Sequence, residues 1–157
     1  MGGGAARQAK TGGSKIKPIK TLSNYSPDQE GRKRVFISFR VDDESQVDLL
    51  RHQAKDDRFG IDFVDYSVKE PFDEKWKTQC TERIRQSSVI IVAIGSETYS
   101  REAVLWEINK AYELGKPVIG MRIYKDENHR IPELMRQNNA KIITWNMEEI
   151  QKELDKA

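Results

Sequence analysis

Val89-Ile90-Ile91-Val92-Ala93-Ile94 is the most apolar run of the sequence, and Gly95 follows it directly. Six consecutive apolar side chains leave no polar face, so a strand formed by this run must be buried on both sides. The central strands of parallel sheets have this property, because helices cover both faces of such sheets. The run therefore predicts the middle of a parallel sheet, and Gly95 predicts where the strand ends.

Shorter apolar runs and helical periods alternate on both sides of this strand. Further strands are predicted at residues 35–39, 59–64, 117–123 and 142–145, and helices at about 47–54, 74–86, 101–114, 132–136 and 147–155. This alternation predicts an α/β fold of three layers, with a five-stranded parallel sheet of flavodoxin-like order 2-1-3-4-5 between helices. Asp42, Asp43 or Ser45 is expected to cap the first helix, and Leu49 is counted among its apolar positions.

The charge distribution divides the chain in two. Residues 1–33 are rich in glycine and lysine and are interpreted as a disordered basic tail, while residues 34–157 are expected to form the folded domain. Residues 1–34 hold eight Lys or Arg against two acidic residues, whereas the remainder holds 19 against 23. A mildly acidic domain argues against a nucleic-acid surface, because phosphate neutralisation needs clustered positive charge. The tail is interpreted as solubilising, with a tether to an anionic surface as the alternative.

Membrane spans, disulfides and metal sites have no signal in the sequence. No apolar run reaches the about 20 residues that a spanning helix needs. Cys80 is the one cysteine, which excludes an internal disulfide and favours a reducing, cytoplasmic setting; it is interpreted as an ordinary buried thiol. His52 and His129 lack partners at metal-ligand spacing, so no metal site is predicted. No Walker loop and no GxGxxG motif follow the first strand, so no bound cofactor is expected.

Ligands of such sheets bind beyond the carboxyl ends of the strands, where the strand order reverses. After the first strand, Ser38, Phe39 and Arg40 offer a hydroxyl, an aromatic face and a guanidinium. These groups suit a nucleotide, through stacking on a base and bidentate contacts with phosphate. The alternative is that Phe39 packs in the core and that Arg40 pairs with Asp42 or Asp43. The sequence leaves both interpretations open.

A long polar loop with two aromatic residues follows the second strand. Its candidate substrate-binding residues are Asp65, Tyr66, Ser67 and Phe72. Functional loops of this length often close over a cleft, and residues 66–72 are our candidate lid. The alternative is a plain surface loop.

The stretch after the central strand carries the sharpest signal. Ser96 lies in the expected turn, and helical spacing then places Glu107 among apolar positions instead of in a solvated charge run. A carboxylate near an apolar cleft can have a raised pKa and can hold substrate hydroxyls as they polarise. The alternative is a buried structural glutamate paired with Arg40 or Arg122.

Five segments match one known family. They are Val35-Phe36-Ile37-Ser38, Phe63-Val64-Asp65-Tyr66-Ser67, Ser88-Val89-Ile90-Ile91-Val92, Val104-Leu105-Trp106-Glu107-Ile108 and Gly115-Lys116-Pro117-Val118-Ile119-Gly120. The stretch that contains them covers over half of the chain and resembles the TIR-like family of bacterial antiphage systems of the Thoeris type. Many TIR domains carry Trp and Cys where this chain has Ala103 and Val104, so the chain departs from the eukaryotic enzymes there.

The resemblance implies an activity. Catalytic TIR domains cleave nicotinamide from NAD with a glutamate on the helix after the central strand, and Glu107 matches that position. Some members cyclise the remaining ADP-ribose into a signal for an effector protein, and enzymes of this family commonly self-associate to complete the site. NAD is then a substrate and not a cofactor. Phe39, Arg40 and Trp106 are our candidates for contacts with its bases and phosphates.

Three rival functions share this fold. In a non-catalytic interaction module, Glu107 would be only structural. A response-regulator receiver would need a phosphoryl-accepting Asp at the end of the third strand, where Gly95-Ser96 stands. A nucleoside deoxyribosyltransferase would also use a glutamate, but would act on deoxynucleosides.

Overall fold

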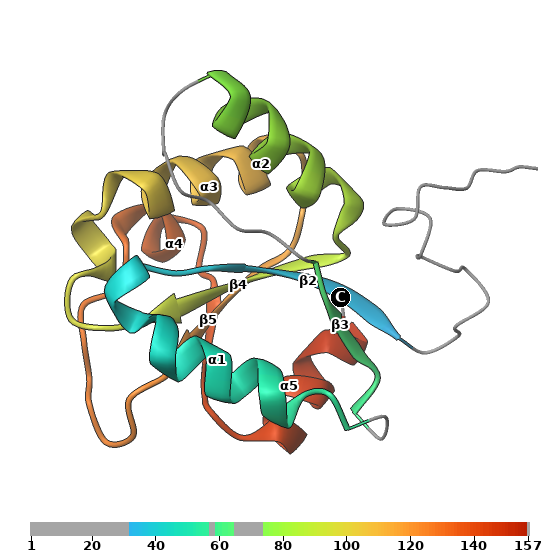
Figure 1. Cartoon of the computed structure of the whole chain (residues 1–157). Coiled ribbons are helices and arrows are strands. Elements are labelled where there is room, and N and C mark those ends of the chain that lie inside the picture. Colours follow the sequence, from blue (N-terminus) through green and yellow to red (C-terminus); the bar gives the residue numbers. More distant parts are fainter. Residues whose placement is uncertain (1–31, 57–58, 65–73, 157) are drawn as a thin grey trace, which may run out of the picture. The chain divides into compact units, whose positions relative to one another are not determined.

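Five parallel strands form the sheet in the part of the chain that the structure describes (Figure 1). The structure is a computed structural model, and it describes residues 32–56, 59–64 and 74–156. The strands are β2 (Lys33–Ser38), β3 (Ile61–Phe63), β4 (Val89–Ile94), β5 (Val118–Arg122) and β6 (Lys141–Thr144). Their order, β3-β2-β4-β5-β6, confirms the predicted order 2-1-3-4-5.

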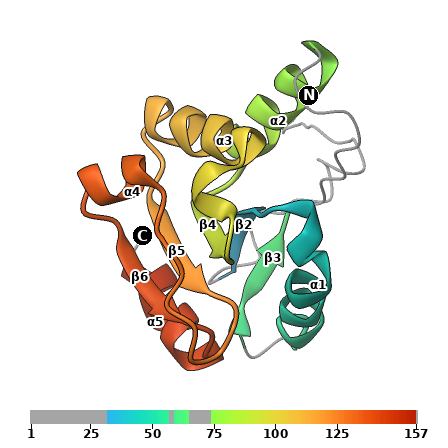
Figure 2. The ribbon, with the colours of Figure 1, turned by 90° about the vertical axis from the view of Figure 1, so that its left-hand side faces the viewer.

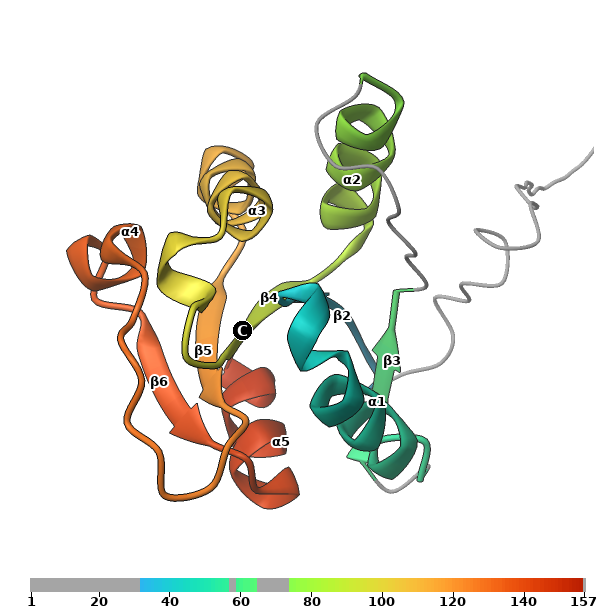
Figure 3. The same ribbon diagram turned by 60° about the vertical axis from the view of Figure 1, so that its left-hand side comes forward.

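Helices cover both faces of this sheet (Figures 2 and 3). One face carries α1 (Glu44–Gln53) and α5 (Met147–Lys156), and the other carries α2 (Glu74–Gln86), α3 (Glu102–Glu113) and α4 (Glu133–Gln137). Two short 3-10 turns, η2 (Val41–Asp43) and η4 (Thr98–Ser100), precede α1 and α3. The three predicted layers are therefore present. Within the described ranges, no helix is long and apolar enough to cross a bilayer.

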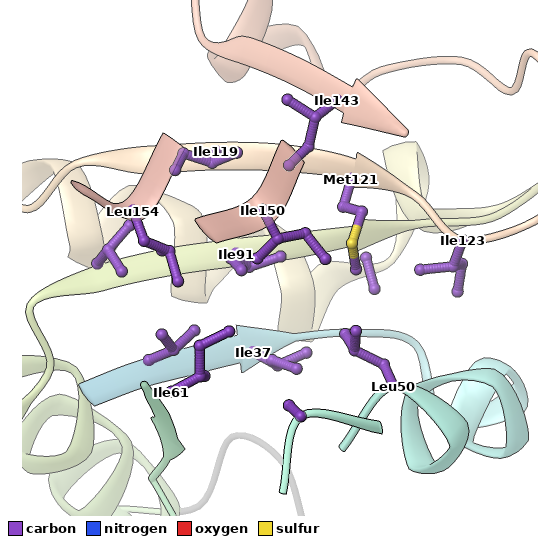
Figure 4. Close-up of a cluster of buried hydrophobic side chains, with 14 of the residues drawn as sticks. Ile37, Leu50, Ile61, Ile91, Ile119, Met121, Ile123, Ile143, Ile150 and Leu154 are labelled. Atoms are coloured by element: carbon purple, nitrogen blue, oxygen red, sulfur yellow. The ribbon is translucent and has the colours of Figure 1, made fainter. Parts of the chain in front are cut away.

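The core consists of two apolar clusters, one on each face of the sheet. β4 is buried along its whole length, and its side chains alternate between the clusters: Ile91 and Ala93 join α1 and α5, whereas Ile90 and Ile94 join α2 and α3. Figure 4 shows the first cluster, in which Ile91 lies near Ile150 of α5. Each fully buried isoleucine stabilises the fold by about 1.5–3 kcal/mol. The prediction that residues 89–94 form the buried middle strand of the sheet is confirmed.

The alternation of β2 decides which side chains face the candidate site. Val35 and Ile37 belong to the cluster under α1 and α5, and Phe39, just beyond the strand, packs against the same cluster. Phe36 belongs to the cluster under α2 and α3. Because side chains alternate along a strand, Ser38 shares the face of Phe36 and points toward α3.

The first helix differs from its prediction in two ways. Leu49 is 57% exposed, because it lies only two positions after Val47 and one before Leu50, which are both buried. A helical period cannot bring all three to one face. In addition, Asp43 occupies the N-cap position of α1 without a side-chain cap bond. Its carboxyl group instead contacts Tyr124 and lies against Gly95.

Candidate functional site

Glu107 is a buried carboxylate on the inner side of α3. It is 5% exposed, and the other buried residues of this helix are Val104, Ile108 and Ala111. These positions repeat at intervals of three and four residues, which is the spacing of one helix face. By contrast, Glu113 on the same helix is exposed and pairs with Lys110 at 2.8 Å. The sequence prediction that Glu107 stands apart from the solvated charges of α3 is confirmed.

Two donors from other elements contact the two oxygens of this carboxylate. Ser38 Oγ donates to Oε1 of Glu107 at 2.5 Å, and Cys80 Sγ donates to Oε2 at 3.8 Å. Both donors are fully buried. Burying a carboxylate costs free energy unless it is hydrogen-bonded. β2 and α2 supply the hydrogen-bond donors for the buried Glu107 of α3. The Cys80 contact was not predicted from the sequence.

The position of Glu107 matches the edge of the sheet where ligands bind in this type of fold. Ser38 is the last residue of β2, and it lies opposite Val92 in the ladder between β2 and β4. The strand order reverses between these two strands, since β3 extends the sheet on one side and β5 on the other. Ligands of open α/β sheets bind beyond the carboxyl ends of strands at this reversal. The carboxylate therefore lies beside the carboxyl end of β2, next to this reversal, although little of it is exposed.

Arg40 joins the tips of β2 and β4. Its side chain is 13% exposed, and its Nη2 bonds to Asp42 at 2.5 Å while its Nη1 lies 3.6 Å from Glu97. The pairing with Asp42 that the sequence left open is thus present. Among the described residues, Nε and Nη1 have no hydrogen-bond partner. The guanidinium is therefore held in place by acidic neighbours, and these two nitrogens are buried donors.

Asp43 is a second buried carboxyl group at this edge. It is 4% exposed, and Tyr124 Oη donates to its Oδ1 at 2.6 Å. This hydrogen bond, together with burial, raises the pKa of Tyr124 to about 12. An added Cβ at Gly95 would lie 2.6 Å from Asp43 Oδ2, so the carboxyl group packs directly on the Gly95 backbone. The sequence had suggested Asp43 as a cap or as a partner of Arg40.

Other predicted site residues are dispersed. Phe39 is partly buried on the opposite face from Glu107, and the Arg51 guanidinium lies 5.4 Å from its ring centre. Trp106 packs against Trp76 of α2, with ring centres 5.1 Å apart. Ser96 is exposed in the turn after β4. Of these candidates in the described part of the chain, Ser38 hydrogen-bonds to Glu107, whereas Phe39, Trp106 and Ser96 lie in other surroundings.

Four candidate residues, Asp65, Tyr66, Ser67 and Phe72, lie outside the described residues, as does the proposed lid at 66–72. They remain predictions. Among the residues that are described, no group of three or more His, Cys, Asp or Glu side chains is arranged to hold a metal ion.

A hollow of about 870 Å³ lies elsewhere, between α1 and the ends of β5 and β6. Its lining includes Gln46, Gln53, Tyr124 and Trp145, and it does not include Glu107. The candidate catalytic carboxylate and this hollow therefore lie at different places in the fold. We place the candidate site at Glu107, because it is a buried, hydrogen-bonded carboxylate at the strand reversal, whereas the carboxylates that line the hollow, Asp126 and Glu127, are exposed.

The family model described as "Thoeris protein ThsB, TIR-like domain" matches residues 36–128, a range that contains Ser38, Cys80 and Glu107. A curated relative from Bacillus cereus (strain MSX-D12), named "Putative cyclic ADP-D-ribose synthase ThsB1", is 32% identical over 105 residues. The match covers 60% of this chain and 55% of the relative, so the chain spans about half of that relative's length.

Two solved structures share the fold. The TIR domain of the Toll-related receptor TRR-2 from Hydra magnipapillata has a TM-score of 0.53 at 15% identity, covering 75% of this chain and 88% of that domain. The CMP N-glycosidase BcmB of Clostridium botulinum has a TM-score of 0.50 at 17% identity, covering 78% of this chain and 99% of that protein. At these identities the likeness concerns the fold alone.

Proposed function

The chain belongs to the family of Thoeris ThsB TIR-like domains, and from this premise we propose that it cleaves the nicotinamide–ribose bond of NAD, with Glu107 as the catalytic residue. The observation that carries the proposal is the Glu107 carboxylate, held by Ser38 at the edge of the sheet where the strand order reverses. The name of the Bacillus cereus relative supports the same class of substrate.

The chemistry requires little beyond an oriented carboxylate. Nicotinamide leaves NAD as a neutral molecule, because the pyridinium nitrogen takes the electron pair of the broken bond, so no general acid is needed. The ribose then carries oxocarbenium-like positive charge, as in glycoside hydrolysis. A fixed carboxylate stabilises that charge and holds the ribose hydroxyls, without reorganising during the reaction.

Ser38 has a supporting role in this proposal. Its hydroxyl is fully buried and donates to Oε1 of Glu107, so it orients the carboxylate in the ligand-free chain. Ser38 was predicted as a substrate-binding residue, and we now propose that it acts on the substrate through Glu107. In this proposal the ribose approaches the carboxylate from the tip of β2.

Arg40 is the proposed phosphate contact. Its Nε and Nη1 are donors without a hydrogen-bond partner among the described residues, and guanidinium groups bind phosphate in a bidentate manner. The diphosphate of NAD competes with Asp42 and Glu97 for this side chain. Trp106 remains our candidate for stacking against a base.

We extend the proposal to cyclisation, in which C1′ of the ribose is attacked from within the same molecule. The bond to nicotinamide breaks, and the new bond to C1′ comes from a hydroxyl of the second ribose, which loses its proton, or from a ring nitrogen of the adenine, in which case the proton leaves the exocyclic amino group. Water must be excluded for this outcome, since water attack gives linear ADP-ribose. The cyclic product is the proposed signal to an effector protein, and self-association of the chain is proposed to complete the site.

The test is the product mixture from NAD. Concentrated wild-type protein is expected to release nicotinamide, detected by chromatography and mass spectrometry, and Glu107→Gln is expected to release almost none. Glu113→Gln is the matched control, because Glu113 is an exposed glutamate on the same helix. Wild-type activity in Glu107→Gln, with a normal thermal transition, would remove Glu107 from the mechanism.

A second candidate is a non-catalytic interaction module, and one observation favours it. Glu107 is only 5% exposed and is hydrogen-bonded, which are also the properties of a structural carboxylate. In that case the wild-type chain would release no nicotinamide at any protein concentration, and Glu107→Gln would lower the thermal stability. Deoxynucleosides tested in parallel would reveal the transferase alternative by release of free base.

A further inference from the structure

Cys80 contacts the oxygen of Glu107 that Ser38 does not contact. From this geometry we infer that Cys80 is a positioning residue, whose thiol fixes the plane of the catalytic carboxylate; the inference rests on the proposed function. The Cys80 Sγ lies 3.8 Å from Oε2, and Ser38 Oγ lies 2.5 Å from Oε1.

The position of Cys80 on α2 explains how the thiol reaches this carboxylate. The buried residues of α2 are Trp76, Cys80 and Ile84, which repeat every four residues and form the inner face of the helix. This face packs on α3, where Trp76 meets Trp106. The same packing that joins the two helices therefore directs the thiol toward Glu107.

Contacts on both oxygens orient the Glu107 carboxylate better than a contact on one oxygen. The last torsion of a glutamate side chain has a broad, two-fold energy profile, so a single hydrogen bond to one oxygen leaves the carboxylate plane poorly fixed. A second donor on the other oxygen restricts that torsion. Because the ribose hydroxyls must meet the lone pairs at defined angles, a fixed plane lowers the cost of reaching the transition state.

The apolar surroundings of residue 80 explain why a cysteine suits this position. Cys80 is fully buried in the apolar cluster with Phe36, Ile84 and Val104. A cysteine there packs as a small apolar residue and still offers a weak S–H donor. A weak donor holds Oε2 in place without withdrawing much of the charge that the ribose cation requires.

The first experiment does not depend on activity. The chain has one cysteine, so the S–H stretching band in the infrared spectrum of the whole protein belongs to Cys80 alone. We expect this band at a lower frequency than that of a thiol in an apolar solvent, and we expect Glu107→Gln to raise it, because an amide oxygen is the weaker acceptor. Cys80→Ser is the blank. A band at the frequency of an unbonded thiol that Glu107→Gln does not move overturns the inference.

The second experiment separates positioning from packing. Cys80→Val fills the apolar space without a donor, and is expected to lower kcat for nicotinamide release about tenfold while KM changes less than about twofold. Cys80→Ser keeps a donor and is expected to rescue kcat to within about threefold of wild type, although a hydroxyl in this cluster lowers the melting temperature. Activity that follows the melting temperature across both variants overturns the inference. The two failures can be told apart. If Glu107→Gln shifts the S–H band but the wild-type chain releases no nicotinamide, the proposed function is wrong while the contact between Cys80 and Glu107 is confirmed.

Discussion

Two buried carboxyl groups lie at the same edge of the sheet, and they are held in different ways. Glu107 is contacted by a buried hydroxyl and a buried thiol from β2 and α2. Asp43 is contacted by the phenol of Tyr124 and lies against the Gly95 backbone. The first arrangement fixes a carboxylate beside the end of β2, at the strand reversal, whereas the second joins η2 to the segment after β5. We therefore assign chemistry to Glu107 and a structural role to Asp43.

The largest expected effect separates the two groups by activity. Glu107→Gln keeps the size of the side chain but removes its charge, and is expected to lower the rate of nicotinamide release by about 10²–10³, the loss typical of one electrostatic contact to a transition state. Asp43→Asn is expected to retain activity within about tenfold. The rates are compared at equal concentrations of folded protein, with NAD in excess. A larger loss in Asp43→Asn than in Glu107→Gln would reverse the assignment.

The next effect concerns stability at Gly95. Gly95→Ala places a Cβ 2.6 Å from Asp43 Oδ2, and overpacking of this kind is expected to cost about 1–3 kcal/mol in the free energy of unfolding. The cost is steric, so it should be smaller in an Asp43→Ala background. Thermal or urea unfolding of the wild type, the two single variants and the double variant measures this difference.

Gly115→Ala is the control for this double-mutant comparison of Gly95 with Asp43. Gly115 has a φ of 70° and no atom within 4 Å of an added Cβ, so its substitution costs backbone strain instead of space. Asp43→Ala should leave that cost unchanged. Equal coupling of Asp43 to both glycines would mean that the contact with Gly95 is not the cause.

A smaller effect concerns the phenol that holds Asp43. The pKa of Tyr124 is raised to about 12, chiefly by its hydrogen bond to Asp43, from an ordinary value of 10.0. Because the folded pKa lies above the unfolded value, this stabilisation is complete below about pH 10 and is lost as the pH rises toward 12. Tyr124→Phe is expected to cost about 0.5–1.5 kcal/mol at neutral pH.

The difference between the tyrosinate absorbance titrations of wild type and Tyr124→Phe reports this pKa. Asp43→Asn should lower it, since the acceptor then loses its charge. If the difference titration is centred near 10 in the wild type, the hydrogen bond does not hold in solution.

The exposure of each side of α3 could be predicted from local periodicity, and the order of the sheet from the alternation of strands and helices along the chain. Periodicity singled out Glu107 as a carboxylate among apolar positions, and the family resemblance supplied its predicted catalytic role. The partners of the two carboxyl groups could not be predicted, since Cys80 and Tyr124 lie 27 and 81 residues from their acceptors. Such contacts depend on how helices and loops rotate against one another in the packed fold. The exposure of Leu49 was missed for a simpler reason, because a run of apolar residues exceeded one helix face.

The smallest expected effect provides the reference for both buried groups. Glu113 is an exposed carboxylate whose pKa is lowered from 4.5, first by its hydrogen bond to Lys110 and then by the charge of that residue. Its folded pKa lies below the unfolded value, so the small stabilisation is present above that value and is lost as the pH falls through the folded pKa. Lys110→Gln is expected to raise the pKa of Glu113 toward 4.5, which a carboxyl NMR titration measures, with hardly any change in melting temperature because exposed ion pairs contribute little. A clear loss of stability from Glu113→Gln itself would mean that charge on α3 matters wherever it lies, and the distinction between the buried and exposed glutamates of this helix would lose its basis.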